Sequence, residues 1–146
     1  MNAKVLDACA IIAFLQGEPG SDAIEDLLTN PLSKCYLHAI NVSEVYAWYL
    51  KRGTQPDATA AVTRIVECGI ELRDDIDLPF WKEVAALKAT ITTTTDPASG
   101  RRRTISLADC FVIALARRLN GRPVTSDHRE FEYVNSSGIC PVEFFR

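Results

Sequence analysis

Four acidic residues lie where short apolar segments meet predicted helices: Asp7, Glu44, Asp109 and Asp127. A carboxylate beside apolar sequence costs free energy unless its charge is paired. A divalent cation pairs with several carboxylates at once, and Mg²⁺ in particular prefers oxygen ligands. Because such an ion polarises a phosphodiester and activates bound water, four acids at one site would indicate metal-assisted hydrolysis.

Each acid also has a purely structural interpretation. Glu44 and Asp109 each follow a capping-type residue by three positions, which is the spacing of a helix capping box. Asp127 fits a turn after a strand, and Asp7 fits a cap for the helix that follows it. The structural explanation is weakest for Asp7, because apolar residues stand on both sides of it.

Hydrophobic periodicity and turn residues predict the elements that position these acids. Short strands are predicted at residues 5–6, 35–37, 70–72, 123–125 and 142–145. Helices are predicted at residues 8–16, 21–28, 41–50, 57–68, 77–91 and 106–119. Their capping residues include Ser21, Asn41 and Ser106, and their core-facing residues include Val66 and Trp81. Residues 92–104 lack core periodicity and predict a polar surface loop.

The alternation of short strands with helices predicts an α/β fold with a mostly parallel central sheet, in one domain over residues 1–146. In such sheets ligands bind beyond the carboxyl ends of the strands. Asp7 and Asp127 directly follow predicted strands. Glu44 and Asp109 fall in the first turns of predicted helices that begin at the same edge. We therefore expect all four acids to meet there.

Composition narrows the class of protein. Hydrophobic residues make up 47% of the chain and charged residues 24%, which indicates a folded core rather than disorder. The five cysteines are scattered and form no CxxC pair, which argues against a disulfide framework or a zinc site. Together with the lack of a signal peptide at the start, they predict a cytoplasmic protein. No apolar run reaches the length of a membrane span, so no membrane association is expected.

No other nucleophile is indicated. The chain has neither a GxSxG motif nor a Walker A loop. With only His38 and His128 present, a Ser-His or Cys-His triad is not indicated. We expect His38 in the core and His128 at the surface, with a contact to a substrate phosphate as the alternative for His128. Cys9 and Cys110 are expected as small buried residues, with redox control or a soft metal as the alternative.

Positive charge is concentrated late in the chain. Residues 96–130 hold seven arginines and four acidic residues, whereas the whole chain has a net charge of -3. Arg101, Arg102 and Arg103 precede the predicted helix of Asp109, so our hypothesis is that they contact substrate phosphates at the mouth of the site. The competing interpretation is a solvated surface.

Four stretches in order carry a resemblance to a known family: VLDACAIIAFL, INVSEVYAWYLKRG, SLADCFVIALA and PVTSDHREF. They resemble the PIN-domain family, and within it the VapC-type ribonuclease toxins of toxin–antitoxin pairs. The resemblance implies a three-layer sandwich and an endoribonuclease that binds Mg²⁺ or Mn²⁺ and hydrolyses single-stranded RNA. It implies Asp7 and Asp109 as central metal ligands, Glu44 as the third acid and Asp127 as a more peripheral fourth. It also implies a small antitoxin partner and a homodimer.

Two further positions bear on this resemblance. Thr125 matches a hydroxyl residue two positions before the last acid and, with the three arginines, is predicted to bind substrate. Cys9 departs from the family, which has a hydroxyl at this position, and a thiol is the poorer hydrogen-bond donor. Cys9 also argues against a haloacid-dehalogenase-type phosphatase, which needs a second Asp there. A catalytically silent PIN-like RNA-binding or scaffold protein and a structural α/β domain with capping acids remain as alternatives.

Overall fold

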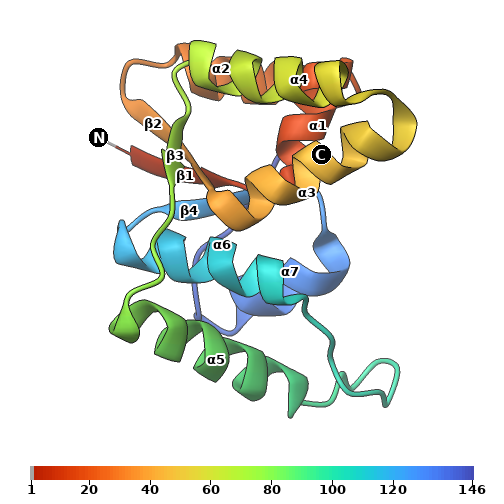
Figure 1. The fold of residues 1–146 in the computed structure, drawn as a ribbon. Helices are drawn as coiled ribbons and strands as arrows, with labels where there is room; N and C mark the ends of the chain where they lie inside the picture. Colours follow the sequence, from red (N-terminus) through yellow and green to blue (C-terminus); the bar gives the residue numbers. More distant parts are fainter. Residues whose placement is uncertain (1) are drawn as a thin grey trace.

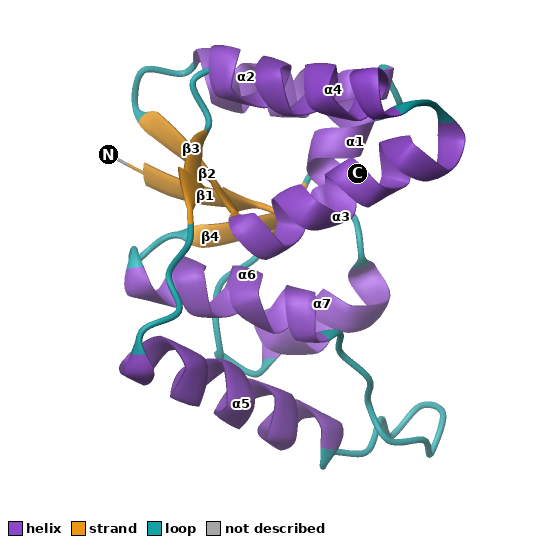
Figure 2. Cartoon of the chain, in the orientation of Figure 1, coloured by secondary structure: helices purple, strands orange, loops and turns teal. Residues whose placement is uncertain are grey.

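A five-stranded sheet forms the centre of the computed structural model, which describes residues 2–146 (Figures 1 and 2). Its strands are β1 (Asn2–Leu6), β2 (Ser33–His38), β3 (Glu71–Arg73), β4 (Arg122–Thr125) and β5 (Glu143–Phe144). Their order is β3-β2-β1-β4-β5, and every neighbouring pair is parallel. The predicted α/β fold with a parallel sheet is therefore confirmed.

Helices cover both faces of this sheet and complete the three layers (Figure 2). They are α1 (Ala8–Gln16), α2 (Ser21–Thr29), α3 (Ala39–Arg52), α4 (Gln55–Glu67), α5 (Leu78–Thr92), α6 (Leu107–Arg118) and α7 (His128–Ser136). Helices α1 to α4 share one apolar core with the sheet, and α5 to α7 share the other. Successive residues of a strand point to opposite faces, so Val5 enters one core and Leu6 the other.

The strand order reverses between β1 and β4. The chain runs outward from β1 to β2 and β3 on one side, whereas β4 and β5 extend the sheet on the other. Ligand crevices of open parallel sheets form at the carboxyl ends of the strands where the order reverses. Leu6 pairs with Val124 at this place, and the backbone N–H of Asp7 donates to the Val124 carbonyl at 3.0 Å.

Helix α6 is apolar almost all round because it lies between the sheet and α5 (Figure 1). Eight consecutive residues, Asp109 to Ala116, are buried in it. Its amino-terminal turn therefore carries Asp109 into the interior rather than to a solvated surface.

Helix α3 begins two residues earlier than predicted. His38 caps it, with the ring Nδ1 accepting from the backbone N–H of Ile40 at 3.1 Å. Asn41, the predicted cap, lies inside the first turn, where it is buried and its side-chain amide has no hydrogen-bond partner within residues 2–146. Glu44 then falls in the second turn, so its interpretation as a capping-box acid is wrong.

Other local predictions also need correction. Gly20, with a φ of 91°, precedes α2 in place of the predicted cap Ser21. Val66 and Trp81 are 53% and 46% exposed rather than in the core, because each lies just outside the inward stripe of its helix. Helix α7 was not predicted at all. Across residues 2–146, no helix has both the length and the apolar composition of a membrane span.

Candidate functional site

Asp7 lies between β1 and α1 and is held on both carboxylate oxygens. Oδ1 accepts from the backbone N–H of Ala8 at 2.7 Å, and Oδ2 accepts from the Thr125 hydroxyl at 2.9 Å. The residue is only 6% exposed. Burial raises the pKa of this carboxyl, and the charge of Asp127 raises it further, despite the hydrogen bonds that favour ionisation. Asp7 is thus fixed in place while its charge is poorly compensated.

Asp109 lies in the first turn of α6, where its backbone N–H donates to the Ser106 hydroxyl at 3.0 Å. The return bond that would complete a capping box, from the Ser106 backbone to the Asp109 carboxylate, does not form in residues 2–146. Thr54 and Asp57 at the start of α4 make both bonds. The Asp109 carboxylate is therefore free of the cap, and burial together with the charge of Asp7 raises its pKa to about 7.

Glu44 and Asp127 complete the set. Partial removal from water and the charge of Asp7 raise the pKa of the otherwise exposed Glu44. Asp127 caps α7, with Oδ1 accepting from the backbone N–H of Glu130 at 3.1 Å. The predicted turn residue is thus a helix cap. Its own backbone N–H donates to the Thr125 hydroxyl at 3.0 Å, which ties the loop after β4 to the loop after β1.

Asp7 is the centre of this group, since its charge acts on Glu44 and Asp109 and the charge of Asp127 acts on it. Within residues 2–146, no three acidic, histidine or cysteine side chains already stand in an arrangement that fits a metal ion. The donor set nevertheless consists of carboxylate oxygens, which suit Mg²⁺ and Mn²⁺. Burial, and then the charges of neighbouring acids, raise the pKa values of Asp7, Glu44 and Asp109, and a cation among them would offset both effects.

Thr125 positions two of the acids through hydrogen bonds. Its hydroxyl is fully buried and bridges the Asp7 carboxylate and the Asp127 backbone. The Cys9 thiol lies 3.4 Å from Asp7 Oδ2 and 3.5 Å from the same hydroxyl. Burial, and then the charge of Asp7, raises the pKa of this thiol to about 11, so it stays protonated and can donate. These contacts favour a positioning role for Thr125 over the predicted contact with substrate.

We expect Thr125→Val to lower the free energy of unfolding by about 1–3 kcal/mol, because it leaves a buried carboxylate and a backbone N–H without their partner. Thr125→Ser keeps the hydroxyl and is the matched control, with a loss of about 0.8 kcal/mol for one methyl group. Urea unfolding of both variants measures the difference. Equal stability of the two variants would rule out the proposed bridge.

Glu130 is a fifth acid that the sequence analysis missed. Burial raises the pKa of its carboxyl, and its charge in turn raises the pKa of Asp109. Oε1 accepts from the Thr104 hydroxyl at 3.0 Å, while Oε2 is buried without a partner in the described chain. The missed signal is the spacing of Asp127 and Glu130, which marks the start of a helix.

The two histidines lie as predicted, His38 in the core and His128 at the surface. His38 is buried against Phe80 and contacts the carbonyl oxygen of Asp75 at 2.8 Å. His128 is exposed and contacts the Glu132 carboxylate at 3.0 Å.

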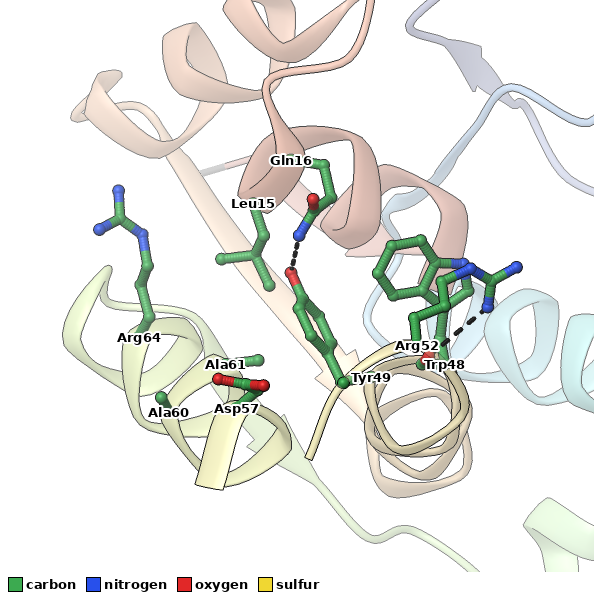
Figure 3. A pocket seen from close by; sticks show the side chains of 10 residues that line it. Leu15, Gln16, Trp48, Tyr49, Arg52, Asp57, Ala60, Ala61 and Arg64 are labelled. Carbon is green, nitrogen blue, oxygen red and sulfur yellow. Dashed lines mark hydrogen bonds between the residues drawn. The ribbon is translucent and has the colours of Figure 1, made fainter. Parts of the chain in front are cut away.

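A separate hollow of about 570 Å³ lies between α1, α3 and α4 and contains none of the four acids. Figure 3 shows Tyr49 pointing across it toward Gln16, to which its hydroxyl is hydrogen-bonded. Arg52 lies over the Trp48 ring at 4.3 Å from its centroid. Because its walls are aromatic and aliphatic with charged edges, this hollow suits a protein segment better than a metal ion.

Comparisons with known proteins agree with this fold. A family model described as PIN domain matches residues 4–136. No curated protein matches the chain.

Several solved structures have the same fold. DNA-bound VapBC from Salmonella typhimurium has a TM-score of 0.73 at 16% identity, covering 100% of both chains. A toxin–antitoxin complex from Klebsiella pneumoniae has a TM-score of 0.67 at 17% identity, covering 98% of each chain. VapC20 from Mycobacterium tuberculosis, described as a sarcin–ricin loop cleaving toxin, has a TM-score of 0.61 at 11% identity, covering 82% of this chain and 86% of its own.

Proposed function

Because this chain belongs to the PIN domain family, a family of nucleases, we propose that it is a metal-dependent endoribonuclease acting on single-stranded RNA. The observation that carries the proposal is the group of Asp7, Glu44, Asp109 and Asp127 around the strands where the sheet order reverses. The similarity to VapBC proteins and to a cleaving toxin supports the further proposal that it is the toxin of a toxin–antitoxin pair.

The four acids would hold Mg²⁺ or Mn²⁺, which when bound supplies an activated water and polarises the phosphate. The chain's own part is to keep the carboxylates in place before the ion arrives. Thr125 holds Asp7 in place, the first turn of α6 carries Asp109, and Asp127 is held as the cap of α7. Attack by water would leave a 5′-phosphate and a 3′-hydroxyl.

Cleavage of a labelled single-stranded RNA by the purified protein tests the proposal. We expect cleavage with Mg²⁺ or Mn²⁺, none in EDTA, and little cleavage of single-stranded DNA or duplex RNA. End analysis of the fragments checks for the 5′-phosphate. Binding of RNA without cleavage under any metal condition would instead identify the catalytically silent RNA-binding alternative.

A small antitoxin is the proposed partner. The supporting observations are the toxin–antitoxin complexes of the same fold and the hollow lined by Trp48 and Tyr49 of the VYAWYL segment. Burial of aromatic side chains is a common feature of tight protein interfaces. The homodimer expected from the resemblance is also a proposal, which the molar mass in solution tests.

A further inference from the structure

The loop before α6 is an ordered hairpin that forms one wall of a cationic pocket. The backbone N–H of Arg103 donates to the Thr94 carbonyl at 3.0 Å, and that of Asp96 donates to the Arg101 carbonyl at 2.8 Å. The pocket has a volume of about 450 Å³. We name it the arginine pocket; its polar lining includes Ser99, Arg101, Arg102, Arg103, Thr104 and Arg129.

The positive charge of this pocket is only partly offset by the protein, through the charges of Asp96 near Arg103 and Glu130 near Arg129. None of the four arginines forms an ion pair within the part of the chain that the structure describes. Asp96 also lines the pocket, but its carboxylate already accepts from the Ala98 backbone N–H at 3.1 Å and the Ser99 hydroxyl at 3.1 Å. One carboxylate committed to the hairpin leaves an excess of positive charge for an anion from outside.

Two side-chain contacts join the pocket to α7. Arg103 stacks over the Tyr133 ring at 4.1 Å from its centroid. The Thr104 hydroxyl donates to Glu130, whose charge acts on Asp109. The pocket therefore borders the acid group, with Arg103 as a packing element and the exposed Arg101, Arg102 and Arg129 free to bind.

We propose that the arginine pocket binds backbone phosphates of an RNA strand beside the phosphate that is cleaved. The inference rests on the proposed function and deepens it. A cleavage centre made of carboxylates repels a polyanion, so a strand needs positive charge close by to stay bound. Arginine suits this role, since its planar group donates several hydrogen bonds to phosphate oxygens.

Binding of a labelled single-stranded RNA in EDTA, measured over a salt series, tests the pocket separately from catalysis. The variant is Arg101→Gln/Arg102→Gln, both at exposed positions. Lys82→Gln/Arg122→Gln is the matched control, since it removes the same charge at exposed residues outside the pocket. Loss of two phosphate contacts should reduce the magnitude of the slope of log K, the RNA-binding constant, against log salt by about 1.4. Near 0.1 M salt, this corresponds to an affinity for RNA that is lower by about 20-fold. The control should retain the wild-type slope.

Equal slopes for the pocket variant and its control would overturn the proposal. A second arm compares the RNA with a 5′-hydroxyl and with a 5′-phosphate, and adds inorganic phosphate as a competitor. We expect equal binding and weak competition. Arginine-dependent binding restricted to the 5′-phosphorylated RNA would identify a terminal-phosphate site and contradict backbone binding.

The two proposals fail separately. If the wild type cleaves RNA but the Arg101→Gln/Arg102→Gln variant binds RNA as the control does, only the proposal for the arginine pocket is contradicted. If RNA binding depends on the two arginines but no metal ion supports cleavage, the proposal for the arginine pocket is supported and only the proposed nuclease activity is contradicted.

Discussion

Replacing Asp7 or Asp109 with asparagine is expected to reduce metal-dependent RNA cleavage by more than about 100-fold. Loss of a residue that merely supports a metal ligand typically costs about 10–100-fold, so loss of a direct ligand should cost more. Asparagine has nearly the same shape and can still accept hydrogen bonds where Asp7 caps α1. The measured quantity is kcat/KM at saturating Mg²⁺ or Mn²⁺.

The control is Asp26→Asn, an exposed acid on α2 whose side chain makes no hydrogen bond within the described residues. It removes the same charge and should retain wild-type activity. Glu44→Gln and Asp127→Asn should fall between the two extremes, because both side chains are less buried than Asp7. Wild-type activity in both Asp7→Asn and Asp109→Asn would leave the structural domain with capping acids as the better interpretation.

Without a divalent cation, we expect the protein to be more stable near pH 5 than near pH 8. The pKa of Asp109 is about 7 in the folded protein against an ordinary value of 3.8. Between these values the folded state binds more protons than the unfolded state, so the free energy of unfolding falls as the pH rises. The contribution lost over this window is at most about 4 kcal/mol. Asp7 and Glu44, whose pKa values are also raised, change stability in the same direction.

Urea unfolding in EDTA from pH 5 to pH 8 measures this effect, with Asp109→Asn as the comparison. Glu132 raises the pKa of the exposed His128, which alters stability in the same direction. The difference between wild type and Asp109→Asn therefore isolates the carboxyl. We expect the variant to show a flatter pH profile and Mn²⁺ to stabilise the wild type more at pH 8 than at pH 5. Parallel profiles would contradict the raised pKa of Asp109.

Local patterns predicted where Asp7 and Asp109 lie relative to their strand and helices. Asp7 stands between a strand and a helix in the sequence, and short-range periodicity defines both elements. Ser106 starts α6 as predicted, which places Asp109 in its first turn. Glu44 was selected from its position near the start of a predicted helix, but its interpretation as a capping-box acid was wrong because α3 begins at Ala39. His38 can cap a helix when its ring accepts from a nearby backbone N–H, and this signal is absent from capping preferences.

The sequence by itself determined the order of the strands and of every helix except α7, the parallel sheet and the acids that follow the strands, since these depend on spacing along the chain. Only the tertiary structure decided that β4 lies beside β1, which brings the Thr125 hydroxyl to Asp7 across 118 positions. The tertiary structure also decided that the Asp109 carboxylate makes no capping-box bond to the Ser106 backbone within the described residues. It likewise decided that Thr104 of the arginine pocket donates to Glu130. Such contacts depend on how whole elements pack, and local periodicity carries no information about them.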